Sequence, residues 1–167
     1  MLLGESNSSM SAPKKDPAHE ELLSVLQTAK NRLEHVTQND WMLIVDRAKR
    51  TVFKKDEVLI QAGKQNKTVY LLVKGNAKVE GAAKAFIAQI GPGEICGEMA
   101  FLENGVASAS VSATGDLEVC AVEWSALSDL FELYPHLGSR FYRSLAVNLS
   151  RRMRELIGAK ATAKVSG

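Results

Sequence analysis

The stretch IGPGEICGEMAFLENGVASASV, residues 90–111, carries the pattern on which the fold assignment depends. It holds a glycine turn and then a short run of helical character beginning at Gly97, and it closes on small residues before Val111. The first backbone N–H groups of a helical turn have no partner within the helix, so they can converge on an anion. Gly97 has no side chain and permits a ligand to approach the backbone closely. The stretch therefore predicts an anion-binding turn between two strands.

Short runs of strand character lie on both sides of this stretch. They are rich in β-branched and apolar residues, and glycines such as Gly63, Gly75 and Gly115 separate them. We expect strands at residues 51–53, 58–61, 68–73, 77–80, 85–90, 108–112 and 118–122. Many short strands at close spacing favour an antiparallel jelly-roll β-barrel over alternating strand and helix units.

Helical patterns precede the strands. Asp16-Pro17 is typical of a helix start, and an apolar stripe then continues at spacings of three and four to a predicted end near Val36. The members of this stripe are Leu22, Leu26, Ala29, Leu33 and Val36. Thr37 and Asp40 resemble a capping box, with aspartate in place of the usual glutamate, and predict a second helix to about Ala48.

Helical patterns return after the last strand. Ser125 is predicted to cap a short helix that Pro135 interrupts, and a last helix is expected from about His136 to Ile157. The apolar stripe of this last helix consists of Leu137, Phe141, Leu145, Leu149, Met153 and Leu156. Gly138 lies in its first turn and predicts that the helix becomes regular a little later. The expected fold class is α+β, with the barrel flanked by N-terminal and C-terminal helices.

The composition is that of one ordinary globular domain. Hydrophobic residues make up 46% and charged residues 24% of the chain, and no run approaches the roughly 18 apolar residues of a membrane span. We expect a disordered tail at residues 1–15, a single domain at 16–158 with its barrel at about 51–123, and a frayed tail at 159–167. The start of the chain lacks the pattern of a secretory signal, so we expect the cytoplasm. A formal net charge of +2 is too small to indicate nucleic acid by itself.

Four ordered motifs resemble the cyclic-nucleotide-binding domain family, which includes the regulatory subunits of protein kinase A and the catabolite activator proteins. The motifs are FKKDEVLI (53–60) followed by Gly63, VYLLVKGNAKV (69–79), IGPGEICGEMA (90–100) and ASASV (107–111). The resemblance covers roughly residues 40–157. It implies the barrel of that family and identifies residues 97–111 as the phosphate-binding segment, which we call the cassette.

By this resemblance the cassette holds a cyclic nucleotide, cyclic AMP or cyclic GMP, and no other cofactor is implied. The implied ligand-binding residues are Gly97, Glu98, Met99, Ala100, Ala107, Ser108 and Ala109. Glu98 matches the family glutamate that accepts a hydrogen bond from the ribose 2′-hydroxyl. Ser108 and Ala109 match positions that contact the cyclic phosphate. The alternative for Glu98 is a structural role, in which its carboxylate accepts a backbone N–H of the barrel.

The cassette departs from the family at Ala107. The family pattern Pro-Arg-x-Ala-[Ser/Thr]-Val places there an arginine that pairs with the phosphate, whereas this sequence reads VASASV at 106–111. Breaking a desolvated charge pair typically costs about 2–5 kcal/mol, so we expect weak or modified binding unless another cation substitutes. Lys64, Lys67 and Lys84 lie in barrel loops, and the sequence does not place any of them at the phosphate.

Catalysis and metal binding are disfavoured. The spacing of Gly91, Gly93 and Gly97 lacks the Gly-Lys-[Ser/Thr] ending of a nucleoside-triphosphate loop. Cys96 and Cys120 lack the spacing of a zinc site and are expected to be buried free thiols, and the three histidines are scattered. The sequence offers no nucleophile–base pair, metal set or paired carboxylates. We therefore expect no metal and no enzymatic activity.

The last helix suggests two kinds of partner. A basic cluster on it fits DNA, an acidic partner or a solvated face, and consists of Arg140, Arg143, Arg151, Arg152 and Arg154. Activator-type relatives carry a DNA-binding domain after this helix, but this chain ends about ten residues later, so we expect no DNA binding by this chain alone. A homodimer seam at heptad spacing would use Tyr142, Leu145, Leu149 and Leu156, with Arg152 as an unfavourable member.

Two functions remain open at this stage. The first is a regulatory, signal-transducing sensor that binds a cyclic nucleotide or a related phosphate ligand weakly or in a modified mode. It would signal through its C-terminal helix to a separate effector protein. The alternative is a degenerate module that binds no nucleotide and serves protein–protein interaction. Glu98 and the glycine turn favour the sensor, whereas Ala107 favours the degenerate module.

Overall fold

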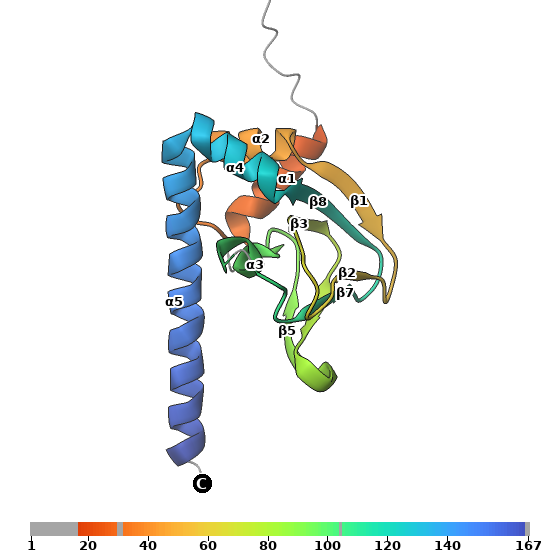
Figure 1. Ribbon diagram of the computed structural model, residues 1–167, viewed down its shortest axis with the longest axis vertical. Helices are drawn as coiled ribbons and strands as arrows, with labels where there is room; N and C mark the ends of the chain where they lie inside the picture. Colours follow the sequence, from red (N-terminus) through yellow and green to blue (C-terminus); the bar gives the residue numbers. More distant parts are fainter. Residues whose placement is uncertain (1–16, 30–31, 104, 166–167) are drawn as a thin grey trace, which may run out of the picture.

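A computed structural model describes residues 17–29, 32–103 and 105–165 (Figure 1). Helices stand at both ends of the described chain, and strands with one short helix lie between them. The elements are α1 Pro17–Thr28, α2 Gln38–Asp46, β1 Lys49–Phe53, β2 Val58–Ile60, β3 Thr68–Lys74, β4 Ala77–Glu80, η1 Ala82–Lys84, β5 Phe86–Ile90, β6 Ile95–Cys96, α3 Glu98–Glu103, β7 Ser110–Ala113, β8 Leu117–Glu123, α4 Trp124–Leu133 and α5 Pro135–Val165. The α+β class and the antiparallel pairing of the strands are confirmed.

The strands form two four-stranded sheets, so the predicted jelly roll is present as two sheets and not as a closed barrel. Their orders are β1-β8-β3-β6 and β2-β7-β4-β5. The edge strands β6 and β2 have only two and three residues, and among the described strands no ladder joins one sheet to the other. Strand β6 was absent from the sequence prediction because two residues produce no alternation that a pattern can detect.

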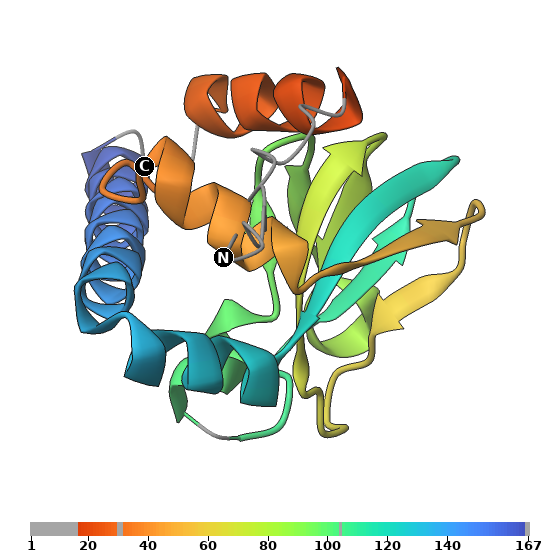
Figure 2. The ribbon, with the colours of Figure 1, turned by 90° about the horizontal axis from the view of Figure 1, so that it is seen from above.

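Two apolar clusters hold the layers together, and β3 contributes to both. Leu71 and Val73 belong to the cluster beneath the helices, whereas Leu72 between them belongs to the cluster between the two sheets. This alternation follows from the two-residue period of a strand, whose successive side chains point to opposite faces. Helices α1, α2, α4 and α5 therefore lie on one side of the molecule and the strands on the other (Figure 2).

The capping box that begins α2 is confirmed. The Thr37 hydroxyl oxygen accepts a hydrogen bond from the Asp40 N–H at 3.1 Å, and the Asp40 carboxylate accepts one from the Thr37 N–H at 3.0 Å. Each residue thus satisfies a backbone donor that the helix leaves without a partner. Aspartate serves as well as glutamate here, and its carboxylate also reaches another helix, as described below.

The prediction that the first helix continues to about Val36 is wrong, because α1 ends at Thr28. The expected cap, Asp16, lies outside the described residues. Leu33 and Val36 are buried as their spacing predicted, but they reach the core from turns. The segment makes local turn bonds, such as the Val36 N–H to the Leu33 carbonyl at 3.1 Å, and it also contacts α5, since the His35 N–H donates to the Ser144 hydroxyl at 3.0 Å.

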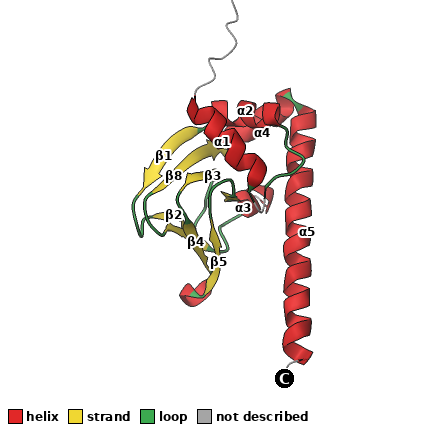
Figure 3. Ribbon diagram, turned by 180° about the vertical axis from the view of Figure 1, so that it is seen from behind, coloured by secondary structure: helices red, strands yellow, loops and turns green. Residues whose placement is uncertain are grey.

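Two predicted details of the C-terminal helices are also wrong. Ser125 does not cap α4, since the residue in the capping position is Glu123, which makes no side-chain cap bond. Helix α5 begins at Pro135, a favourable first position for proline, and continues to Val165 instead of ending near Ile157 (Figure 3). Gly138 does not delay it. A Cβ at this glycine would lie 3.0 Å from the Cβ of Phe131, so the glycine allows α4 and α5 to pack closely.

Candidate functional site

The cassette starts at Gly97, and the backbone conformation there requires a glycine. Gly97 has φ +89°, and a Cβ there would overlap the carbonyl oxygen of Thr68 in β3. The chain thereby turns from β6 into α3, whose Phe101 N–H donates to the Gly97 carbonyl at 3.3 Å. In this turn Ala100 is buried and Met99 is exposed. The predicted turn from strand to helix therefore exists.

The end of the cassette is fixed to the β2–β3 loop, residues 61–67. The Ala107 N–H donates to the Lys64 carbonyl at 3.0 Å, and the Ala107 carbonyl accepts from the Gly63 N–H at 2.8 Å. Ala107 is buried in the cluster between the sheets, so its methyl group occupies core. Ser108 is exposed and Ala109 is half-buried.

The same loop also touches the start of the cassette. The Asn66 side-chain amide donates to the Thr68 carbonyl at 2.6 Å, and its nitrogen lies 2.9 Å from the position that a Gly97 Cβ would take. One loop thus spans both ends of the cassette. The predicted residues 97–100 and 107–109 are brought to the same neighbourhood by this loop, although they come from different elements.

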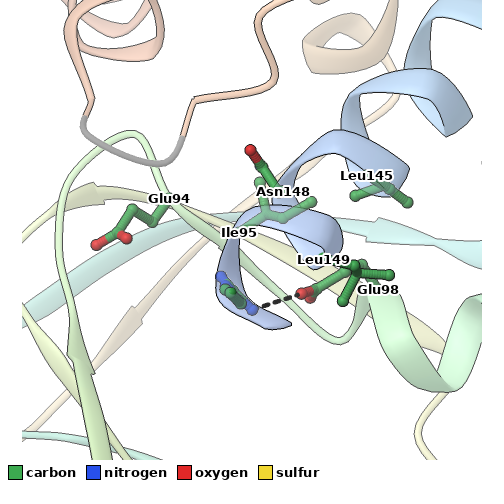
Figure 4. A pocket seen from close by; sticks show the side chains of 7 residues that line it. Glu94, Ile95, Glu98, Leu145, Asn148 and Leu149 are labelled. Carbon is green, nitrogen blue, oxygen red and sulfur yellow. Dashed lines mark ion pairs between the residues drawn. The ribbon is translucent and has the colours of Figure 1, made fainter. Parts of the chain in front are cut away.

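Glu98 faces α5, which was not expected. Its side chain is only 7% exposed, and its Oε1 lies 3.8 Å from Nη1 of Arg152. Burial raises the pKa of this carboxyl, and the nearby Arg152 charge lowers it by a smaller amount. The carboxylate lines a small pocket between β6, α3 and α5, where a dashed line marks the ion pair (Figure 4). This pocket has a volume of about 10 Å³, room for roughly one water molecule and far too little for a nucleotide.

A polar stripe on α5, which the sequence did not predict as a set, contacts the rest of the molecule. It consists of Arg140, Ser144, Asn148 and Arg152, at successive spacings of four. Arg140 makes two hydrogen bonds of 2.7 Å to the carboxylate of Asp40 in α2. The spacing of four is visible in the sequence and places these residues on one helix face, but it was hidden by the longer apolar stripe beside it.

The basic cluster predicted on this helix is not one uniform patch. Arg140 pairs with Asp40, Arg152 with Glu98, and Arg151 lies 3.8 Å from a Glu34 carboxylate oxygen. These side chains connect α5 to the body of the protein, which is a structural use of their charge.

The cysteines are free and buried, as predicted. Burial raises the pKa of both the Cys96 and the Cys120 thiol, which keeps them protonated and unreactive. Within the described residues, no three His, Cys, Asp or Glu side chains are grouped so that they could hold a metal ion. Among the helices of the same residues, none has both the length and the apolar character that a membrane crossing requires.

The sequence model of the cyclic nucleotide-binding domain family matches residues 50–134, slightly more than half of the chain. Cyclic GMP-binding protein C of Dictyostelium discoideum is 30% identical over 138 residues, which are 75% of this chain and 5% of that protein. The cyclic AMP receptor protein of Thermus thermophilus is 30% identical over 113 residues, 64% of this chain and 49% of that protein. The chain thus spans half or less of these relatives.

Solved structures give the same picture of the fold. A cyclic nucleotide-binding domain from Methylobacillus flagellatus has a TM-score of 0.68 at 22% identity. The similarity covers 82% of this chain and 79% of that one. It confirms the arrangement of two antiparallel sheets with flanking helices.

Proposed function

We propose that this chain, which belongs to the cyclic nucleotide-binding domain family, is a regulatory module that binds a cyclic nucleotide at the cassette and signals through α5. The observation that carries the proposal is the contact between Glu98 of the cassette and Arg152 of α5. Family membership supports a cyclic nucleotide ligand. The contact supplies a physical path from that ligand to the helix.

The path works through competition for one carboxylate. Glu98 is buried, so its negative charge is stabilised by few groups, and Arg152 is one of them. A ribose hydroxyl that donates to the same carboxylate changes its interaction with Arg152. A ligand shifts a conformational equilibrium only by its differential affinity for the two states, and this shared carboxylate provides such a difference. Binding at the cassette would thereby loosen or reposition the distal part of α5.

The proposed ligand contacts come from both ends of the cassette. They are Gly97, Glu98, Met99 and Ala100 at the start, and Ala107, Ser108 and Ala109 at the end. Cyclic AMP and cyclic GMP are the candidate ligands, and binding is expected to be weak because Ala107 carries no charge. We assign the chain a non-catalytic role. The buried free thiols Cys96 and Cys120 fit a reducing compartment such as the cytoplasm.

The exposed distal part of α5 is the proposed output surface. Tyr142, Ala146, Leu149, Met153 and Leu156 follow one another at spacings of four and three, and the last two are at least 60% exposed. This spacing fits a two-stranded coiled coil with a second copy of the chain, and a separate effector protein would read the changed helix. Leu145, which belonged to the predicted seam, is 2% exposed and packs in the core beneath the helices, so it is not part of this surface.

A degenerate module without a ligand is the second candidate function. The observation in its favour is that Ala107 carries no charge that could pair with a phosphate, and that its methyl group is buried between the sheets. In this case the fold would serve protein–protein interaction alone, again through the exposed side of α5.

Calorimetry on the full chain with cyclic AMP, cyclic GMP and cyclic dinucleotides separates the two candidates. If the sensor is correct, wild type binds one of them, and Arg152→Gln binds it more tightly, by up to about fivefold, since the Arg152 side of the ion pair is exposed. Arg151→Gln is the matched control, since it removes the same charge from the neighbouring position, which contacts Glu34. Silence of the wild type toward all ligands, with binding appearing in Ala107→Arg, would establish the degenerate module.

A further inference from the structure

We propose that Lys64 supplies the positive charge that holds the cyclic phosphate, in place of the arginine that is absent at Ala107. This inference rests on the proposed function and names a further ligand-binding residue for the same site. It starts from the charge of the cassette itself. Residues 97–111 contain two glutamates, Glu98 and Glu103, and no lysine or arginine. A bound phosphate diester, which carries one negative charge, would find no counter-charge on the cassette.

The backbone places Lys64 directly beside the position of the missing arginine. The Lys64 carbonyl accepts the Ala107 N–H at 3.0 Å, and the preceding residue, Gly63, donates its N–H to the Ala107 carbonyl at 2.8 Å. One residue further, Gln65 and Val106 form a β-bridge. Lys64 is therefore the residue of a neighbouring chain segment that lies against Ala107. A lysine carries its ammonium on a flexible four-carbon stem, so from this backbone contact it can extend toward a phosphate bound at the end of the cassette.

The charge of Lys64 is available for a ligand. Its side chain is exposed and makes no hydrogen bond or ion pair with any other residue that the structure describes. Three other lysines are engaged, because Lys54, Lys74 and Lys78 lie within 4.0 Å of Asp116, Glu21 and Glu80. Gly63, with φ +80° and nothing within 4 Å of an added Cβ, leaves open space at the turn before Lys64.

The other two lysines considered from the sequence are placed elsewhere. The Lys67 carbonyl accepts the Trp124 N–H at 3.0 Å, which fixes its part of the loop to the start of α4. Lys84 lies in η1, at the tip of the hairpin formed by β4 and β5 (Figure 1). The backbone hydrogen bonds thus distinguish Lys64 from Lys67 within one loop.

An ammonium does not replace a guanidinium in every respect. Arginine presents a planar fork that binds two phosphate oxygens at once, whereas lysine acts as a point charge with three donors. An exposed point charge is also screened by salt, with a Debye length of about 8 Å at physiological ionic strength. Cyclic nucleotide binding through Lys64 should therefore be weaker than through arginine and should decline as the salt concentration rises.

The test is titration of the full chain with cyclic AMP and cyclic GMP by calorimetry, comparing Lys64→Gln with Lys67→Gln. Both variants remove one exposed charge from the same loop, and both should keep the wild-type fold by circular dichroism. Lys64→Gln should weaken binding by about tenfold to a hundredfold, the usual worth of a hydrogen bond to a charged group, and Lys67→Gln by less than about threefold.

The outcomes separate this inference from the function on which it rests. If wild type binds and Lys64→Gln binds equally well, Lys64 is not the phosphate ligand, while the sensor function stands. Equal losses in Lys64→Gln and Lys67→Gln also overturn the inference, because the charge would then act only through the general field of the loop. If wild type binds neither cyclic nucleotide, both the function and the role of Lys64 are refuted.

Discussion

Replacing Asp40 by asparagine should destabilise the protein, because its carboxylate fixes α5 to α2. Asp40 is 3% exposed, and it accepts two hydrogen bonds of 2.7 Å from Arg140 as well as one of 3.0 Å from the Thr37 N–H. Asparagine has nearly the same size, so the substitution leaves no cavity. It removes the charge and replaces one acceptor oxygen by an amide that can only donate.

The expected loss can be worked out from these contacts. A hydrogen bond to a charged group contributes about 1.5–3 kcal/mol, and asparagine keeps one acceptor for three donors. At least one bond to Arg140 is therefore lost, and the other becomes a bond to a neutral oxygen. We expect the free energy of unfolding to fall by about 2–4 kcal/mol, toward the lower end because water can reach Arg140.

The effect should depend on pH in a defined direction. The Arg140 guanidinium lowers the pKa of Asp40, and this outweighs the opposing effect of burial. Stabilisation from a carboxyl with a lowered pKa is complete above its unfolded value of about 3.9 and is lost as the pH falls through the folded value. The difference between wild type and Asp40→Asn should therefore be largest near neutral pH and should shrink below about pH 4.

Urea unfolding followed by tryptophan fluorescence measures this difference, since the buried Trp41 lies next to Asp40 in α2. Asp116→Asn is the matched control, because Asp116 also faces a basic side chain, that of Lys54 at 3.5 Å, but is exposed. It should leave stability almost unchanged. A change smaller than about 0.5 kcal/mol in Asp40→Asn at neutral pH, or a loss that persists undiminished at about pH 3, would refute the reasoning.

Three further predictions concern the cassette and α5. Gly97→Ala should destabilise more than Gly63→Ala: both glycines have positive φ, costing about 1–2 kcal/mol each, but only a Cβ at 97 overlaps a backbone oxygen of β3. Equal losses in thermal melts would contradict this. Glu98→Gln should raise the free energy of unfolding at neutral pH. Burial raises the pKa of Glu98, so the folded state favours the protonated carboxyl and loses stability as the pH rises through the folded pKa, whereas glutamine stays neutral. The gain should vanish below about pH 4, and a loss at neutral pH would argue against it. Leu156→Glu should abolish a dimer seen by sedimentation, whereas Arg154→Glu, off the apolar stripe, should not; a monomeric wild type would exclude the dimer.

Local patterns in the sequence predicted most of the elements. The capping box of Thr37 and Asp40 was identified from two residues, since both partners of that motif lie within one helical turn. The strands were identified because glycines and alternating apolar residues mark their ends and faces. The end of α1 at Thr28 was not identified, because the segment that follows contacts α5 through His35 and Ser144, and the local sequence does not record a contact with a distant helix.

The candidate site was predictable only in part, for a similar reason. The turn at Gly97 follows from a short motif, and the structure places it as expected. The partner of Glu98 does not follow, because Arg152 comes near only when α5 has packed beside α3. The position of Lys64 against Ala107 likewise depends on the path of the β2–β3 loop, which joins segments distant in sequence.

The arrangement of α5 determines where a signal can leave the molecule. Its first turns are held by Arg140 and by the buried Ser144, so motion there would break strong contacts. From residue 153 to residue 161 the helix is exposed, and its apolar residues Met153 and Leu156 belong to neither core cluster. The ion pair with Glu98 therefore stands at the boundary between the fixed and the free part of the helix. In the proposed sensor, a ligand that takes over Glu98 would change the last contact before the free part, and a partner that binds Met153 and Leu156 in only one arrangement of the helix would alter the affinity of the cassette by the same factor.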